Sequence, residues 1–324
     1  MAKQTTTKKK ANKKPAAKPS TKTKSTKAVA TATPSKTTAP AVVPEKKTAT
    51  PVAKSEAVKS AKAPKDPQDR LARWYRWTSI VLFLEALAVT LFGNKAATAL
   101  TMQYPALDSL ASESNGHPVL ALASRHIADV HIAWAVSTFL LVFAVISGLL
   151  VTLYRPYFNT VLARGVNAFR WVALGIGGGV MIVAMALLSG FSSLQLLLSL
   201  FVLTMLAGML ALAADVLVAR NNGVKTRFAH LLCGTALIAG LTPWAVFALA
   251  VIGKLLWHGH IPAYLYSIYG CQLALFVAVL LAMHFRLKRQ GRWADALYAD
   301  RSFLLLGFVA ATVLAAQIFV GVLK

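Results

Sequence analysis

The chain has 324 residues, and its 35 Lys and Arg residues against 11 Asp and Glu residues give a formal net charge of +24. At the same time, 56% of its residues are hydrophobic. Such a charge is typical of polar, nucleic-acid-binding chains, and such apolarity is typical of membrane proteins, so one uniform soluble domain is excluded. Two cysteines, Cys233 and Cys271, both in apolar runs, also argue against a disulfide scaffold.

Residues 1–69 carry more than half of the net charge. They contain 17 Lys, no Arg and four acidic residues, which gives +13, and they have no Leu, Ile, Phe, Tyr or Trp. A segment of this composition cannot bury enough apolar surface to offset its chain entropy, so we expect a disordered tail. Two interpretations stay open: a polycationic arm that binds anionic lipid or nucleic acid, or a solvated linker.

Residues 70–324 form the second predicted domain, which is embedded in the lipid bilayer. Seven apolar stretches each approach the ~20 residues that a helix needs to cross ~30 Å of hydrocarbon. The predicted membrane-spanning helices cover residues 76–97, 127–153, 168–189, 192–218, 228–252, 262–285 and 302–322. The predicted fold class is therefore an all-α membrane protein with a bundle of seven transmembrane helices.

The distribution of basic residues predicts the orientation of this bundle. The first stretch is preceded by Arg70, Arg73 and Arg76, and most other Lys and Arg residues of the domain lie in connections on the same side. The opposite side carries only Lys95, Arg125, Lys254 and Lys324. By the positive-inside rule, we expect a multi-pass protein of the cell membrane with its N-terminus in the cytoplasm and its C-terminus outside.

Two connections make structural predictions of their own. The long outside loop, residues 93–125, contains three turn signals, which predict a short hairpin on the outer surface: Tyr104-Pro105, Ser114-Asn115-Gly116 and His117-Pro118. The connection between the third and fourth stretches, residues 189–192, is so short that these two helices must be antiparallel neighbours.

Short motifs follow one another in a recognisable order from the third stretch onward. They are Asn167 to Val172, Val180 to Val183, Pro243-Trp244, Ile261-Pro262 with Tyr266, Gly291-Arg292-Trp293, Asp300-Arg301, and Gln317-Ile318-Phe319 with Gly321. In this order, and with seven stretches and a long first outside loop, residues 70–324 resemble the heliorhodopsins. The resemblance implies a rhodopsin-like bundle whose topology is inverted relative to other microbial rhodopsins.

The resemblance also implies where retinal chemistry would take place. A rhodopsin binds retinal as a Schiff base on a lysine of the seventh helix, and a carboxylate on the third helix balances the buried cation. Here the lysine position is Ala311 and the counterion position is Ala173. Because both halves of the ion pair are missing together, we expect no covalently bound retinal and no other cofactor.

Six side chains are candidate pocket or polar residues. Glu85 lies near the middle of the first stretch, where a lone carboxyl group is either a proton-linked or ligand-contacting group or a neutral acid bonded to a neighbouring helix. Trp244 and Tyr266 are aromatic candidates for the pocket that the resemblance implies. The remaining three are His131, Gln272 and Gln317; of these, Gln272 and Gln317 would line an inner cavity or bond across helices, and Gln317 would reach His131 if their helices are adjacent.

Three other features have modest interpretations. The outer cluster of Arg125, His126, Asp129 and His131 is interpreted as an interfacial helix cap rather than a metal site. Asp215, near the inner end of the fourth stretch, is expected to reach Arg220 or water. The glycine run 175–179 is interpreted as close helix packing rather than a phosphate loop.

No catalytic motif or metal-ligand spacing occurs in the sequence, so we expect no enzyme activity. The main hypothesis is a membrane sensor, receptor or interaction scaffold that does not bind retinal covalently. The alternatives are transport of a small solute or ion through the bundle, and a photoreceptor with non-covalently bound retinal. The resemblance also implies a homodimer.

The two interpretations of the tail predict different salt dependence. If residues 1–69 act as a polycationic arm, a peptide of these residues should bind vesicles rich in phosphatidylglycerol, and binding should fall steeply with ionic strength because counterions screen the attraction. Cosedimentation over a salt series measures this. Absent or salt-insensitive binding would support the linker.

Overall fold

The computed structural model describes residues 67–220, 227–257 and 259–324. Of the predicted tail, all but the last three residues lie outside the described residues. In chain order, the elements are α1 (Pro67–Phe92), β1 (Ala97–Leu107), α2 (Ser109–Asn115), β2 (Leu120–His131), α3 (Ile132–Thr152), α4 (Arg155–Ala163), α5 (Ala168–Leu188), α6 (Leu194–Arg220), α7 (Arg227–Leu256), α8 (Ala263–Lys288), the 3₁₀ turn η1 (Gly291–Ala294), α9 (Ala296–Ile318) and the π-helical turn η2 (Phe319–Leu323).

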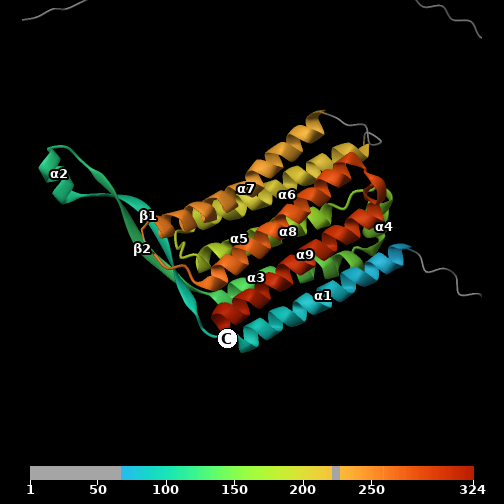
Figure 1. Cartoon of the computed structure of the whole chain (residues 1–324), viewed down its shortest axis with the longest axis horizontal. Helices are drawn as coiled ribbons and strands as arrows, with labels where there is room; N and C mark the ends of the chain where they lie inside the picture. Colours follow the sequence, from blue (N-terminus) through green and yellow to red (C-terminus); the bar gives the residue numbers. More distant parts are fainter. Residues whose placement is uncertain (1–66, 221–226, 258) are drawn as a thin grey trace, which may run out of the picture. The chain divides into compact units, whose positions relative to one another are not determined.

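Seven of the helices in the described part of the chain are long and apolar enough to cross a membrane, which confirms the predicted seven-helix bundle. They are α1, α3, α5, α6, α7, α8 and α9, the last continued by η2. In space α1 lies beside α3 and α9, and α3, α5, α6 and α7 follow one another, while α8 lies beside α9. Figure 1 shows these helices running nearly side by side.

Helix α1 begins at residue 67, nine residues before the start of the predicted stretch, and it ends at residue 92, five residues before the predicted end. Its buried residues recur every three or four positions, and the first of them, Leu71 and Tyr75, precede the apolar stretch. The amphipathic pattern that packs α1 on the bundle therefore extends through the arginine-rich segment. Gly93 and Asn94 follow the end of the helix. The backbone N–H of Asn94 donates to the Leu323 carbonyl at 3.0 Å.

The interior of the bundle is close-packed and its outer surface is apolar. Phe139, Leu140 and Leu314 are fully buried at the centre of the largest core cluster. By contrast Ile238 and Leu249 of α7 are 69% and 68% exposed. Exposed aliphatic side chains on a spanning helix face lipid, where they need no protein partner.

Helices α5 and α6 approach each other most closely at a pair of glycines. A Cβ atom added to Gly208 would lie 2.9 Å from Cα of Gly175 and 3.1 Å from the Trp171 carbonyl oxygen. Both obstacles are backbone atoms, so no side chain can move aside. This confirms that the glycine run beginning at Gly175 serves close helix packing, and the short turn before α6 holds the two helices antiparallel as predicted.

The long loop is a hairpin, as predicted, but a long one. Strands β1 and β2 pair antiparallel from Ala97 opposite His131 to Leu107 opposite Leu120, with an irregularity after Leu100. Figure 1 shows the hairpin and α2 projecting beyond one end of the bundle, which we call the hairpin end. At its base, the Thr101 amide donates to the Ser192 carbonyl at 2.8 Å.

The prediction that residues 127–131 begin the second spanning helix is wrong, because they belong to β2. The outer cluster is therefore on a strand, not on one face of a helix. The exposed side chains of His126 and Asp129 contact each other at 3.0 Å, and Arg125 is not part of this contact. An apolar run that passes directly into a helix gives no local signal of the boundary, so pairing with β1 decides it.

A second difference is a helix in the connection between the second and third spans. Helix α4 was not predicted, and its Phe158 is fully buried against the ring of Tyr75, with the ring centroids 5.5 Å apart. Asp69 and Arg155 pair beside it. The short helix thus covers the end of the bundle opposite the hairpin.

Replacing Gly208 by alanine should destabilise the bundle by about 1–3 kcal/mol, because the methyl group forces α5 and α6 apart. The midpoint of thermal unfolding in detergent measures the loss. Gly234→Ala on α7 is the matched control, since an added Cβ there meets nothing within 4 Å. Equal midpoints for the two variants would contradict the close approach.

Candidate functional site

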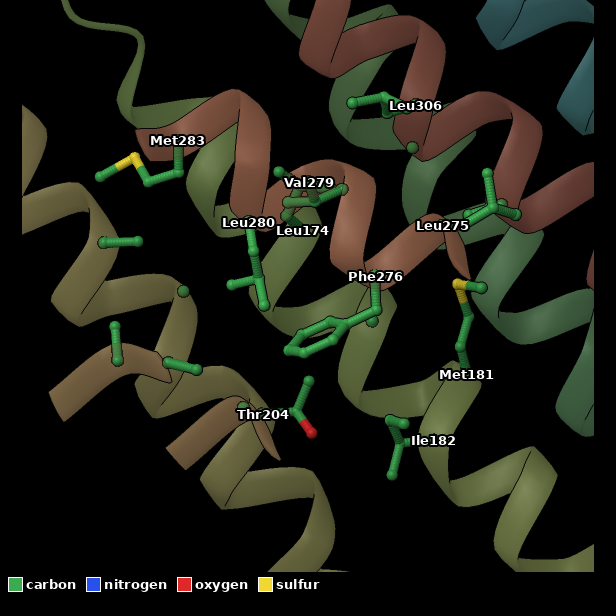
Figure 2. Close-up of a pocket in the computed structure, with 18 of the residues that line it drawn as sticks. Leu174, Met181, Ile182, Thr204, Leu275, Phe276, Val279, Leu280, Met283 and Leu306 are labelled. Carbon is green, nitrogen blue, oxygen red and sulfur yellow. The ribbon is translucent and has the colours of Figure 1, made fainter. Parts of the chain in front are cut away.

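A cavity of about 180 Å³ lies inside the bundle among α5, α6, α7, α8 and α9, with one residue from α3. Figure 2 shows Phe276 and Leu280 of α8 pointing toward Thr204 of α6 across this space, with Met181 and Ile182 of α5 on a third side. The glycines Gly178, Gly208 and Gly240 belong to the wall, so the helix backbones themselves form part of it.

The wall of the cavity is almost entirely apolar. Its aromatic members are Trp171, Trp244, Phe143 and Phe276, and the rings of Trp244 and Phe276 are 5.8 Å apart. None of the described residues that line it is an Asp, Glu, Lys, Arg or His. Such a cavity suits a neutral, apolar molecule, and a few polar groups would set its orientation.

Two hydrogen bonds account for polar groups in this wall. The Thr204 hydroxyl donates to the Leu200 carbonyl of its own helix at 2.9 Å. The Gln272 Nε2 of α8 donates to the Ala310 carbonyl of α9 at 3.1 Å. Gln272 is only 4% exposed, so this bond is formed in the interior and links the two helices.

Ala311 and Ala173, which the sequence resemblance assigns to the retinal lysine and its counterion, carry only methyl side chains. Ala311 follows directly after the carbonyl that Gln272 binds and is fully buried in the core. Ala173 is 7% exposed and lines a second, smaller cavity of about 30 Å³ among α1, α3, α5 and α9. Both methyl groups pack as ordinary core side chains.

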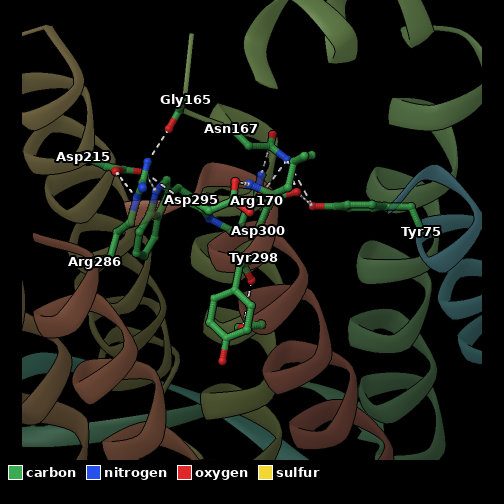
Figure 3. A network of polar contacts seen from close by, with 12 residues as sticks. Tyr75, Gly165, Asn167, Arg170, Asp215, Arg286, Asp295, Tyr298 and Asp300 are labelled. Atoms are coloured by element: carbon green, nitrogen blue, oxygen red, sulfur yellow. Dashed lines mark hydrogen bonds and ion pairs between the residues drawn. The ribbon is translucent and has the colours of Figure 1, made fainter. Parts of the chain in front are cut away.

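Toward the end of the bundle opposite the hairpin, a buried network of charges joins five helices (Figure 3). Its hub is Arg170 of α5. The guanidinium donates from Nη1 to Asp300 of α9 at 2.8 Å and from Nη2 to Asp215 of α6 at 2.7 Å. All three residues are at most 6% exposed.

Neutral donors surround the Asp300 carboxylate. The Tyr75 hydroxyl of α1 donates to it at 2.8 Å, and the Asn167 amide, just before α5, donates to both carboxylate oxygens at 3.1 and 3.2 Å. Asn167 also caps α5, since its side-chain oxygen accepts from the Arg170 amide. One carboxylate therefore positions α1, α5 and α9 together.

A second arginine completes the network on the side of α8. Arg286 donates to the carbonyls of Gly165 at 2.6 Å and Trp293 at 3.1 Å, and its Nε lies 3.5 Å from Asp215 Oδ1. The last contact is an ion pair rather than a hydrogen bond. Two arginines and two aspartates balance, so the network buries no net charge.

Trp171 connects the network to the cavity. Its indole N–H donates to Asp215 Oδ2 at 3.2 Å, while its ring belongs to the cavity wall. The Arg170 guanidinium lies over the same ring, 5.1 Å from its centroid. A molecule that displaces the Trp171 ring would therefore act directly on the ion pair of Asp215.

The structure separates the six candidate residues. Trp244 and Gln272 line the cavity. Tyr266 does not, and it is 45% exposed on the bundle surface. Glu85 is half-buried between α1 and α9, where both of its oxygens accept from the Thr312 hydroxyl at 3.0 and 3.1 Å, and it lines none of the described cavities.

The predicted meeting of His131 and Gln317 does not produce a hydrogen bond among the described residues. Gln317 Nε2 instead donates to Ser267 of α8, at 2.9 Å to its hydroxyl and 3.2 Å to its carbonyl. The His131 ring packs against Trp134, with centroids 4.9 Å apart. The two side chains therefore have different partners, because Gln317 of α9 points toward α8.

The expectation that Asp215 reaches Arg220 or water is also wrong, because Asp215 is buried and pairs with Arg170. The network as a whole was missed. Its members Asn167, Arg170 and Asp300 were recognised only as parts of motifs. The sequence did contain a signal for this network, because Arg170 and Asp215 lie within predicted spans. Charged residues are rare in membrane-spanning segments and usually pair with one another.

These observations define the class of protein: a seven-helix membrane protein with an apolar interior cavity next to a buried, charge-balanced network. Comparison with known families places it further. The sequence profile of the family described as Heliorhodopsin matches residues 71–323, and the chain belongs to this family. No match was found among curated proteins.

Replacing Asp300 by asparagine should cost about 3–5 kcal/mol of stability, because it removes one of the two carboxylates that balance buried Arg170. Thermal unfolding in detergent measures the loss. The matched control is Asp295→Asn, an exposed N-cap of α9 where asparagine caps as well as aspartate.

If the cost arises from unbalanced charge, the double variant Asp300→Asn/Arg170→Met should recover part of the stability, because one arginine, Arg286, then remains to balance one aspartate, Asp215. A single variant that unfolds at the same temperature as Asp295→Asn would show that the network contributes little.

Proposed function

We propose that this heliorhodopsin-family protein forms no Schiff base with retinal and acts as a membrane sensor or receptor for an apolar molecule that binds non-covalently in the interior cavity. The observation that carries the proposal is the cavity itself, of about 180 Å³, together with Ala311 on the seventh helix, where the resemblance implies a lysine. An interaction scaffold is the neighbouring interpretation, in which the basic tail and rim bind a partner.

The size and chemistry of the cavity support a ligand. Protein interiors are close-packed, so a cavity of this size is unusual. One water molecule needs only about 10–15 Å³ of such cavity volume. Water is poorly suited to so apolar a wall, because each buried water needs two to four polar partners. An apolar molecule would fill the space and gain the contacts that the wall offers.

The charge network supports a route for the signal. A ligand can shift a conformational equilibrium only through a difference in its contacts with the two states. Here Trp171 touches both the cavity and Asp215, so a change in its position would alter the ion pairs that join α5, α6 and α9. The expected readout is at the end of the bundle that the arginine distribution places in the cytoplasm.

Of the alternatives, transport has the weaker support. The one carboxyl group proposed to carry it, Glu85, faces Thr312 between α1 and α9 and is not part of the cavity wall. A photoreceptor with non-covalently bound retinal would use the same cavity as the proposed ligand. We propose no catalytic role.

We also propose a homodimer, as the family resemblance implies. The projecting hairpin supports this proposal. Its apolar side chains Leu107, Leu110 and Leu122 are 63%, 79% and 78% exposed, beyond the end of the helices. A second copy would cover such residues, which otherwise face water on the predicted outside.

The test of the proposed function is an absorption spectrum. The purified full-length protein, incubated with all-trans retinal, should show no red-shifted band, because neither Ala311 nor any described residue of the cavity wall supplies a primary amine. A red-shifted band that hydroxylamine bleaches would prove a Schiff base and overturn this part of the proposal. A light-dependent change without that band would favour the non-covalent photoreceptor.

A further inference from the structure

We infer that the ligand of the cavity is an apolar alcohol whose hydroxyl group donates a hydrogen bond to Oε1 of Gln272. This inference rests on the proposed function and deepens it, since it names the chemical class of the ligand. It follows from which hydrogen-bonding groups of the wall are already used within the protein and which one is not.

The orientation of the Gln272 amide is fixed by its partner. A backbone carbonyl oxygen can only accept, so the group that faces Ala310 at 3.1 Å must be the NH₂ end of the side chain. The other end is therefore Oε1, an acceptor with two lone pairs. The contact with the Ala310 carbonyl therefore resolves the usual ambiguity between the oxygen and nitrogen ends of a glutamine side chain.

Within the described residues, Oε1 of Gln272 has no hydrogen-bond donor. The residue belongs to the cavity wall and is only 4% exposed. Oε1 is not among the fully enclosed side-chain atoms that lack a partner, so its lone pairs are accessible from the cavity. A buried amide oxygen without a donor is unfavourable, and native proteins rarely leave one so. A ligand that donates to it would remove this penalty.

The other polar groups of the wall do not offer a matching strong donor. The Thr204 hydroxyl already donates to Leu200, and the Trp171 indole N–H already donates to Asp215. Cys233 has only a weak S–H donor. A ligand with an acceptor alone, such as an aldehyde, ester or ether, would find only the second Nε2 hydrogen of Gln272 as a strong donor, and it would still leave Oε1 of Gln272 without a partner.

Charged ligands are disfavoured for a different reason. An acid or an amine is ionised in water at neutral pH, and it would have to enter as an unpaired ion or give up its charge first, because no residue of the described wall carries the opposite charge. A neutral hydroxyl group meets the free acceptor of Gln272 without bringing a charge. The body of the ligand would then contact Phe276, Leu275 and Val279 of α8, which Figure 2 shows around the cavity.

The experiment compares an alcohol with its methyl ether, which keeps the shape and removes the donor. Full-length protein in detergent is titrated with all-trans-retinol and with all-trans-retinyl methyl ether, and energy transfer from tryptophan to the polyene reports binding, since Trp171 and Trp244 are in the wall. Retinol should bind about tenfold more tightly, which corresponds to about 1.4 kcal/mol.

Two glutamine variants assign the effect to one residue. Gln272→Leu should lose the preference and bind the two compounds with equal affinity. Gln317→Leu is the matched control, since Gln317 bonds Ser267 and does not line the cavity, and it should keep the tenfold preference. If Gln272→Leu does not fold, the relative affinity of the unaltered protein for the alcohol and the ether is the test of the inferred ligand class.

The outcomes separate this inference from the proposed function. Equal binding of alcohol and ether to the unaltered protein would overturn the alcohol and leave an apolar ligand standing. A preference that survives in Gln272→Leu would overturn the role of Gln272. No binding of either compound would contradict the non-covalent apolar ligand itself, and the alcohol with it.

Discussion

The bundle depends on the way one buried arginine is balanced. A guanidinium removed from water among apolar helices is strongly unfavourable unless anions meet it with good geometry. Arg170 obtains two, and they come from different helices, Asp215 of α6 and Asp300 of α9. Satisfying both at once fixes the rotation of three helices, and Tyr75 and Arg286 extend the same constraint to α1 and α8.

This network joins the helices through charges that involve neither Ala173 nor Ala311, the positions that the family resemblance assigns to the retinal ion pair. The charges that join the helices lie near one end of the bundle, whereas the alanines at 173 and 311 are packed as core residues. Alanine at both positions, where the resemblance implies a lysine and a carboxylate, leaves no unpaired charge there. The cavity is a separate feature, bounded by glycines that let α5 and α6 approach and by a tryptophan that touches both regions.

Local pattern was sufficient for the spans and insufficient for their ends. An apolar run of about 20 residues predicts a spanning helix wherever it occurs, so all seven were found. The start of α1 was missed because its first packed residues, Leu71 and Tyr75, lie among arginines. Residues 127–131 were assigned to a helix because their strand partner, β1, lies about thirty residues away in the sequence.

The sequence by itself determined the seven helices, the uneven distribution of arginine, and the presence of alanine where the family resemblance places a lysine and a carboxylate. Only the tertiary structure decided which polar groups meet. Asp215 pairs with Arg170 rather than with nearby Arg220, Gln272 faces the cavity while Tyr266 faces outward, and Tyr75 reaches a carboxylate 225 positions later. The reason is physical: composition sets whether a helix enters the membrane, but its rotation and neighbours follow from packing and charge balance among all seven helices.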